Sequence, residues 1–141
     1  MKIISVSNEK DIEKITELIH DNSFNLDYVQ FDSSLNLLKI KFYRRKWKER
    51  EILKKYLIFK KYKISTVESF LNIYNVKDFT IEDEAQIGIY EFDKIKFNSI
   101  KKILTITSCF PLLINITVTD LKIEIEDLDK IVKEEVFYSI L

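Results

Sequence analysis

The sequence contains only one residue each of glycine, proline, cysteine, histidine and alanine among its 141 positions. A single glycine cannot build a phosphate-cradling loop or a dinucleotide-binding fingerprint, because both motifs need several glycines at fixed spacing. The serine-hydrolase pattern G-x-S-x-G is missing for the same reason. The common nucleotide-dependent and serine-hydrolase chemistries are therefore excluded. No other catalytic motif is found, and we expect neither enzyme activity nor a cofactor.

The shortage of alanine, glycine and proline also indicates the fold class. Isoleucine, phenylalanine and tyrosine are abundant instead, with 23, 10 and 7 copies, and these residues favour strands over helices. Turns must then be built by Asn, Asp and Ser, whose side chains bond the nearby backbone. The lone Cys109 cannot form an internal disulfide, so we expect it to pack as a buried thiol in a reducing compartment.

The length and charge of the chain bound its class further. With 141 residues and no linker or low-complexity tract, residues 1–141 are expected to form one domain. The 23 basic and 23 acidic side chains cancel, so the net charge points to neither nucleic acid nor a membrane. No apolar run approaches the roughly 20 residues that cross a bilayer. The apolar start at residues 1–7 is too short for a signal peptide. We expect a soluble, cytoplasmic protein without a membrane partner.

The most informative pattern is a segment that occurs twice. Residues 27–40 and 93–106 are identical at five of fourteen positions when aligned with an offset of 66. Each copy has two runs of alternating apolar and polar residues, rich in β-branched and aromatic side chains, around a short polar turn. This pattern is typical of a β-hairpin, so we predict a duplicated hairpin within one domain.

The remaining elements can be placed around these hairpins. Apolar residues at Ile12, Ile15 and Ile19 predict one amphipathic helix over about residues 8–21. A change of alternation at Asn75 predicts a bulge or break, and Gly88 predicts a bulge or a close backbone approach within a strand. We predict a mainly β (α+β) fold, namely a sandwich, roll or partly closed barrel of about seven to nine antiparallel strands.

Two segments are harder to assign. Residues 44–56 have helix-forming composition without a clean apolar period, so they form either a helical turn or an extended connection. Residues 127–141 begin at an Asp and are compatible with a short C-terminal helix that packs Ile131, Val136 and Phe137.

The strongest local charge lies in residues 39–63, which hold twelve basic and two acidic side chains with interleaved aromatic residues. Lysine, arginine and exposed aromatic rings suit single-stranded nucleic acid. Two structural interpretations compete: the basic segment lies across an acidic neighbour in the fold, or its lysines protect a sheet edge. The candidate interaction surface comprises Arg44, Arg45, Lys46, Trp47, Lys48, Arg50, Lys54 and Lys55.

Other chemistry-bearing residues give weaker signals. The acidic cluster Glu82–Glu84, with Asp78 or Glu91, offers oxygen ligands but lacks the spacing of a calcium loop, and a solvated turn is the preferred interpretation. With one histidine and one cysteine, a tetrahedral zinc site is not expected. We expect His20 to interact with the helix end and not with Cys109.

The helix followed by Ile19-His20-Asp21 and by the hairpin over residues 26–32 resembles small β-rich bacterial proteins of unknown function, and it is also similar to some toxin-immunity proteins. The resemblance implies a binding protein and transfers no catalytic residue. We therefore expect a non-enzymatic interaction or structural module with a protein partner or with a second copy of itself. The alternative is single-stranded nucleic-acid binding through residues 39–63.

Overall fold

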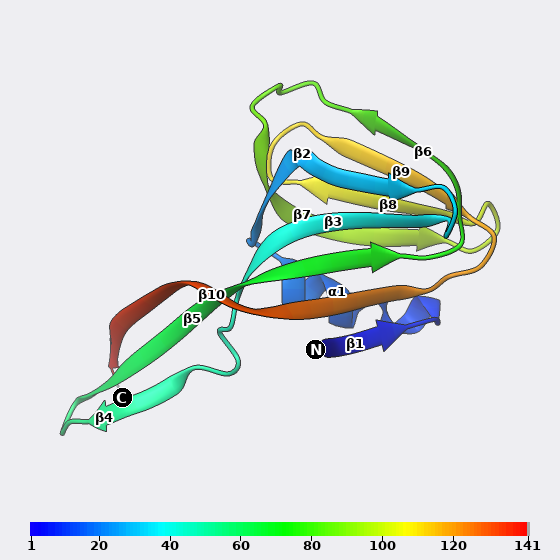
Figure 1. Cartoon of the computed structure of the whole chain (residues 1–141). Helices are drawn as coiled ribbons and strands as arrows, with labels where there is room; N and C mark the ends of the chain where they lie inside the picture. The colour runs from blue at the N-terminus through cyan, green and yellow to red at the C-terminus, as the bar shows by residue number, and fades with distance from the viewer. Residues whose placement is uncertain (141) are drawn as a thin grey trace.

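The computed structural model describes residues 1–140, which form ten strands and one short α-helix (Figure 1). The mainly β fold class is confirmed, with ten strands instead of seven to nine and a sheet that is not closed into a barrel. The elements are β1 (Lys2–Val6), a 3-10 turn (Glu9–Asp11), α1 (Ile12–Ile19), β2 (Ser23–Asp32), β3 (Leu37–Arg45), β4 (Glu51–Lys55), β5 (Phe59–Ile73), β6 (Val76–Glu82), β7 (Ile89–Asn98), β8 (Ile103–Ser108), β9 (Leu113–Val118) and β10 (Ile123–Ile140).

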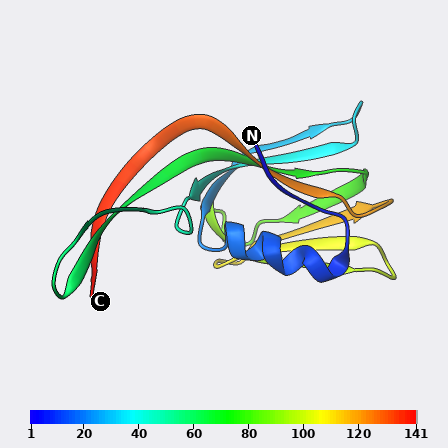
Figure 2. The ribbon, with the colours of Figure 1, turned by 90° about the horizontal axis from the view of Figure 1, so that it is seen from below.

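All ten strands pair antiparallel in one sheet with the order β1-β10-β5-β3-β2-β7-β8-β9-β6, and β4 pairs with β5. Within residues 1–140, the two halves of this sheet share strand pairing only where residues 23–25 of β2 pair with residues 89–91 of β7. Because the remaining parts of β2 and β7 do not pair with each other, the sheet can curl and enclose one core (Figure 2).

The core lies between the two halves of the curled sheet and is closed on one side by α1. Side chains from both halves are fully buried together, for example Phe42, Leu71 and Ile125 with Phe92 and Ile114. Phe92 stacks on Phe24 at 4.2 Å between ring centroids, which ties the halves at their point of contact. This body holds most of the buried apolar surface, and burial of such surface is the main stabilising contribution to a fold.

The two similar segments fold as hairpins with the same register. In each turn a side-chain oxygen, Asp32 Oδ1 or Asn98 Oδ1, accepts hydrogen bonds from the backbone two and three residues later. Each turn also ends on a residue with positive φ, Asn36 at 49° and Lys102 at 54°. The paired residues correspond throughout: Phe31–Leu38 with Phe97–Leu104, and Val29–Ile40 with Ile95–Ile106.

The helix is shorter than its apolar period predicts. The first turn is a 3-10 turn, and α1 covers residues 12–19 with Ile12, Ile15 and Ile19 buried, as predicted. Asn8 precedes the 3-10 turn with extended backbone angles, but its side chain makes no capping hydrogen bond. No helix in the described part of the chain is long and apolar enough to span a membrane.

The predicted irregularities are only partly correct. A break at Asn75 is confirmed, because β5 ends at Ile73 and Asn75 has φ of 58° before β6 begins. Gly88 lies just before β7 and not inside it, and no atom lies within 4 Å of the position that a Cβ would take. Its φ of +82° is the reason for glycine, because side-chain-bearing residues are strained there.

The short C-terminal helix expected for residues 127–141 was a wrong prediction. Residues 123–140 form the long strand β10, which pairs with β5 from Ile73 to Phe59, and Leu141 lies outside the described residues. The spacing of Ile131, Val136 and Phe137 wrongly suggests a helix. Register shifts in β10 interrupt the alternation that is typical of a strand between Asp127 and Lys133. The segment 44–56 is extended: β3 ends at Arg45, a connection follows, and β4 begins at Glu51.

A three-stranded ribbon projects away from the body and is called the arm here (Figures 1 and 2). The arm consists of residues 51–66 and 128–140, that is β4, the first half of β5 and the second half of β10. None of these residues belongs to the core cluster of the body. Within β5 the buried apolar residues change sides: Leu71 and Ile73 are buried in the body, but Tyr62 and Ile64 in the arm. Since side chains alternate along a strand, body and arm bury opposite faces of β5.

Candidate functional site

The eight residues predicted as an interaction surface do not share one surface. Arg44 is only 1% exposed, Lys46 and Arg50 are half-buried, and the other five are exposed. They follow the chain from the end of β3, through the connection of residues 46–50, to β4. The charge and aromatic pattern in the sequence therefore marks a segment that runs from the body into the arm, but not the function of each side chain.

Arg44 lies at the junction of body and arm and belongs to a buried ion pair. Its Nε and Nη2 donate hydrogen bonds to the two carboxylate oxygens of Asp127 at 3.0 and 2.7 Å. Ser69 Oγ donates to the same carboxylate at 2.6 Å, and Glu49 accepts from Arg44 at 2.9 Å. The Arg44 guanidinium thus joins β3 to β10 and to the β3–β4 connection, in the two-pronged geometry that makes arginine–carboxylate pairs strong. The Asp127 carboxylate extends the network to β5 through Ser69.

The charges of this pair are stabilised despite burial. Burial alone would raise the pKa of the Asp127 carboxyl, but the hydrogen bonds from Arg44 and Ser69 and the charge of Arg44 outweigh it and lower the pKa. Burial would likewise lower the pKa of Arg44, yet its bonds to Asp127 and Glu49 raise it. Both groups therefore stay ionised in the folded protein.

The part of the basic segment next to the body is matched by acidic side chains of neighbouring elements. Ion pairs join Arg45 to Glu135 at 3.6 Å and Lys63 to Glu134 at 3.3 Å, both across strands of the sheet. The remaining pairs are Lys48–Glu17 at 3.3 Å and Lys41–Glu68 at 3.1 Å. These contacts favour the interpretation in which the basic segment lies across acidic parts of the same fold.

The aromatic residues near this segment also have internal partners. Trp47 stacks on Phe137 with ring centroids 5.1 Å apart, and Phe137 stacks on Tyr62 at the same distance. The Arg50 guanidinium lies 4.9 Å from the Trp47 ring centre and 5.1 Å from that of Tyr62. This cluster covers the face of the arm on which Tyr62 and Ile64 are buried, so it is a small core of its own.

Sequence reasoning missed the most exposed feature of the arm, which is the outer edge of β10. Among residues 1–140, β1 pairs with β10 only over residues 123–126, so no strand pairs with the outer edge of residues 128–140. Val136, Tyr138 and Ile140 are 53%, 60% and 87% exposed on one face of this edge strand. An unpaired edge with large apolar side chains is a template for pairing with another strand.

Two other edge strands of the sheet, β4 and β6, are better protected. The edge strand β4 has five residues and ends in Lys54 and Lys55, and β6 carries Lys77, Asp78 and Glu82. Short strands and charged side chains prevent edge-to-edge pairing. In β10 the two register shifts distort the edge only over residues 127–133, and such irregularities hinder pairing with a further strand. Residues 133–140 keep regular register with β5. Residues 134–140 therefore form the free edge of the arm, which we call the open edge.

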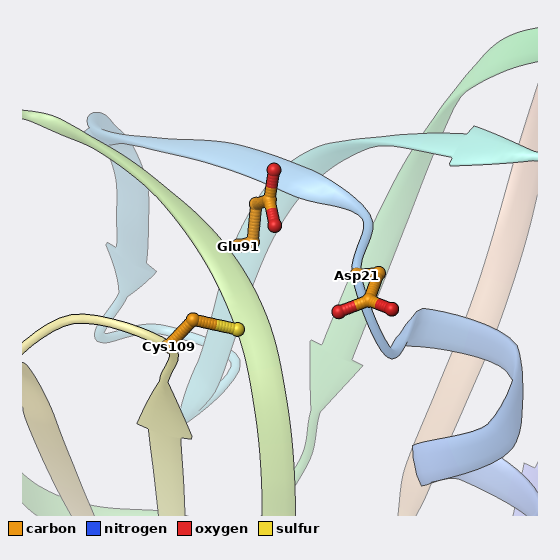
Figure 3. Close-up of side chains that lie close together, drawn as sticks. All are labelled: Asp21, Glu91 and Cys109. Atoms are coloured by element: carbon orange, nitrogen blue, oxygen red, sulfur yellow. The ribbon is translucent and has the colours of Figure 1, made fainter.

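A second cluster lies on the body, where the end of α1, β7 and the end of β8 meet (Figure 3). The ligand atoms of Asp21, Glu91 and Cys109 all lie within 4.8 Å of one another, and all three residues are exposed. Backbone hydrogen bonds Asp21 N–Phe92 O and Cys109 N–Glu91 O hold the segments together. A carboxylate–thiolate set of this kind can ligate a metal ion, but exposure and the absence of a fourth ligand in the described chain leave it a surface cluster.

The expectation of a buried Cys109 was wrong, because the residue is exposed just after the end of β8. Partial burial of its sulfur and the negative charges of Asp21, Asp93 and Glu91 raise the pKa of its thiol. A raised pKa keeps the sulfur protonated, and a protonated thiol is a poor nucleophile. The cluster therefore does not favour nucleophilic chemistry.

The remaining candidates occupy turns. His20 follows α1, and its Nδ1 lies 2.9 Å from the Asp93 carbonyl oxygen instead of contacting the helix end. Asp83 accepts hydrogen bonds from the Tyr90 hydroxyl and the Gln86 amide, so it stabilises the turn between β6 and β7. The sequence does not reveal the pairing of His20 with Asp93, because they are 73 residues apart.

Comparison of the chain with protein-family models, with curated proteins and with solved structures finds no match in any of the three. The function of the protein must therefore be inferred from its own residues and their geometry.

We expect Asp127→Asn to lower the free energy of unfolding by about 3 kcal/mol, because it leaves the buried Arg44 charge without its main partner. Lys48→Met is the matched control, since it breaks an exposed ion pair with Glu17 and should cost less than about 1 kcal/mol. Urea unfolding followed by Trp47 fluorescence measures both values. If both variants lost the same small amount of unfolding free energy, the buried pair would not be what holds the junction of body and arm.

The same pair should make stability depend on pH in acid. Because the folded protein lowers the pKa of Asp127 below its ordinary value of 3.8, the stabilisation is complete above that value and is lost as the pH falls through the lowered pKa. The difference in unfolding free energy between wild type and Asp127→Asn should be constant above about pH 4 and shrink below it. A difference that does not change with pH would contradict the assignment.

Proposed function

We propose that the protein is a non-enzymatic interaction module that self-associates through the open edge of β10. The observation that carries the proposal is an unpaired strand edge with exposed apolar side chains on an arm that projects from the body. Among residues 1–140, nine of the eighteen exposed large apolar side chains lie on the arm, although it is about a fifth of the chain. Surface apolar residues concentrated in this way mark an interaction site.

The sequence of the open edge is complementary to itself in antiparallel pairing. If a twofold axis passes through Phe137, Val136 of one copy lies opposite Tyr138 of the other, and Glu135 lies opposite Ser139. Aromatic and β-branched residues are a favourable cross-strand pair, and no like charges meet. A register centred on Glu135 would oppose two carboxylates, which is unfavourable. A closed twofold dimer is the commonest arrangement of soluble oligomers.

The arm is preorganised for this role by the ion pair at its base and by the cluster of Trp47, Tyr62 and Phe137. An isolated two-stranded hairpin is marginal in water. The third strand and the aromatic cluster hold the open edge extended before it meets a partner, which reduces the entropy lost on association. The resemblance to small β-rich bacterial proteins of unknown function implies a binding protein, which is the same class of function.

The nucleic-acid alternative receives less support from the geometry. Arg44, Arg45 and Lys48 are engaged in ion pairs, and Trp47 is stacked within the arm. Residues with internal partners must give them up to contact phosphate or bases. Self-association needs no such rearrangement, because the open edge is already free.

We expect the double variant Val136→Glu/Tyr138→Glu to be monomeric under conditions in which the wild type has twice the mass of a 16.9 kDa chain. Inside one chain the new carboxylates lie opposite Lys63 and Lys61 on the neighbouring strand β5, so the arm keeps favourable cross-strand pairs. Between copies they would face each other and repel. Sedimentation equilibrium over a range of concentrations measures the mass.

The exposed Ile89 on the body provides the control, because Ile89→Glu adds charge outside the arm and should leave the dimer intact. Hydrogen exchange adds a test of the register: alternate amides of residues 134–140, those not bonded to β5, should become protected at high protein concentration. The proposal would be overturned if the wild type were monomeric at every concentration. It would also be overturned if Ile89→Glu lowered the mass as much as Val136→Glu/Tyr138→Glu does.

A further inference from the structure

The outer end of the arm is a hairpin turn with an unusual composition. Residues 54–61, called the tip here, read Lys-Lys-Tyr-Leu-Ile-Phe-Lys-Lys. The Tyr56 amide donates to the Phe59 carbonyl oxygen at 2.7 Å, so Leu57 and Ile58 alone form the loop, and they are 96% and 66% exposed. Such loops normally hold Asn, Asp or Gly. Where a sequence breaks a local rule without a structural gain, a functional role is the expected reason.

The four lysines of the tip lie opposite one another on the two paired strands. Lys54 pairs directly with Lys61 across the two strands, and Lys55 pairs with Lys60. Like charges directly opposite each other destabilise a sheet. In the described chain none of these four lysines forms an ion pair, in contrast to Lys63 and Arg45 nearer the body. The tip therefore holds a positive charge that an external anion would stabilise.

The positive charge surrounds the end of the ribbon. Because cross-strand partners point to the same face and neighbours to opposite faces, the Lys54–Lys61 pair lies on one face and the Lys55–Lys60 pair on the other. A ligand that contacts only one face would leave half of the charge unused. A surface approached end-on by the tip contacts both pairs together.

Aromatic rings lie between the aliphatic loop and the rest of the arm. Tyr56 packs on Phe59 at 4.4 Å between ring centroids, and Tyr138 meets Phe59 edge-on at 5.6 Å. Along the arm the order is thus aliphatic at the extreme end, then aromatic, with lysines beside them. Membrane-bound proteins show this order, with aliphatic groups among acyl chains, aromatic rings at the interface and lysines at the headgroups.

We infer that the tip inserts Leu57 and Ile58 end-on into an anionic lipid bilayer while the four lysines bind headgroup phosphates. The expectation of no membrane partner rested on net charge and on the lack of a spanning segment, and neither concerns a protein that binds at the bilayer surface. Nucleic acid would use the lysines and the rings but not the aliphatic loop. Insertion accounts for all three kinds of residue.

Flotation of the full chain with vesicles tests the inference. We expect binding to vesicles enriched in phosphatidylserine, weak binding to pure phosphatidylcholine, and a loss of affinity as salt rises. Leu57→Ser/Ile58→Ser should weaken binding at least about tenfold, because two aliphatic side chains no longer leave water. Lys60→Gln and Lys61→Gln should each weaken it about fivefold.

The matched control is Ile100→Ser, which removes an isoleucine that is 93% exposed in another turn beside Lys101 and Lys102. It should leave vesicle binding unchanged. In a Trp47→Phe background, Leu57→Trp should place the only tryptophan at the tip, and its emission should shift to the blue when vesicles are added. Circular dichroism of each variant should match that of the wild type, which checks that the variant is folded.

Three results would overturn the inference: no binding to phosphatidylserine vesicles at low salt, vesicle binding unaffected by Leu57→Ser/Ile58→Ser, or tighter binding to single-stranded DNA than to vesicles. Vesicle binding by the tip does not depend on self-association. Leu57→Ser/Ile58→Ser is designed to remove vesicle binding and to leave the dimer intact, because neither residue lies on the open edge, so failure of either proposal can be recognised separately.

Discussion

The buried ion pair between Arg44 and Asp127 is the constraint on which the relation between body and arm depends. It lies where β3 ends, where β10 leaves its regular register and where β5 changes the face that it buries. A buried charge without a partner is costly, so β3 and β10 can separate only by giving up the whole pair. Ser69 and Glu49 extend the same constraint to β5 and to the connection that leads into β4. The base of the arm is therefore held in a fixed position relative to the body.

Beyond this base, the arm divides into three parts with different chemistry. The part next to the body neutralises its charge internally, through the pair of Lys63 with Glu134. The middle part has an aromatic cluster on one face and the open edge with its exposed apolar side chains on the other. The tip keeps four lysines around an aliphatic loop, and none of them forms an ion pair within residues 1–140. A net charge of zero conceals this separation, because the acidic partners of the basic segment are distributed along the rest of the chain.

Patterns confined to one element predicted the fold well. The two hairpins, the apolar face of the helix and the break at Asn75 depend on residues close in sequence, whose periodicity and turn chemistry act locally. The predictions for Cys109 and for the C-terminal helix failed because they depend on distant contacts. Whether Cys109 is covered is decided by how β7 and the end of α1 pack around it. Residues 127–140 are extended because β5 offers them a strand edge.

The candidate surface was predicted only as a region. Twelve basic residues within residues 39–63 pointed to a segment that runs from the body into the arm, but the sequence could not distinguish the buried Arg44 from the exposed Lys54. That difference arises from Asp127, which is 83 residues away from Arg44. The open edge of β10 was missed because a strand edge is free or paired according to the order of strands, and strand order is not encoded in any short segment.

The position of β10 has a consequence for how the protein folds. This strand pairs with β1, and the Met1 amino group donates to the carbonyl oxygen of Asp127 across 126 residues of sequence. Contacts of such long range form late, because closing a long loop costs chain entropy before any contact compensates for it. Until β10 arrives, the groove between β1 and β5 is open, and a β10 strand from a neighbouring chain fits there as well as the molecule's own. We therefore expect refolding to be slow and concentration-dependent, with exchange of this strand between chains.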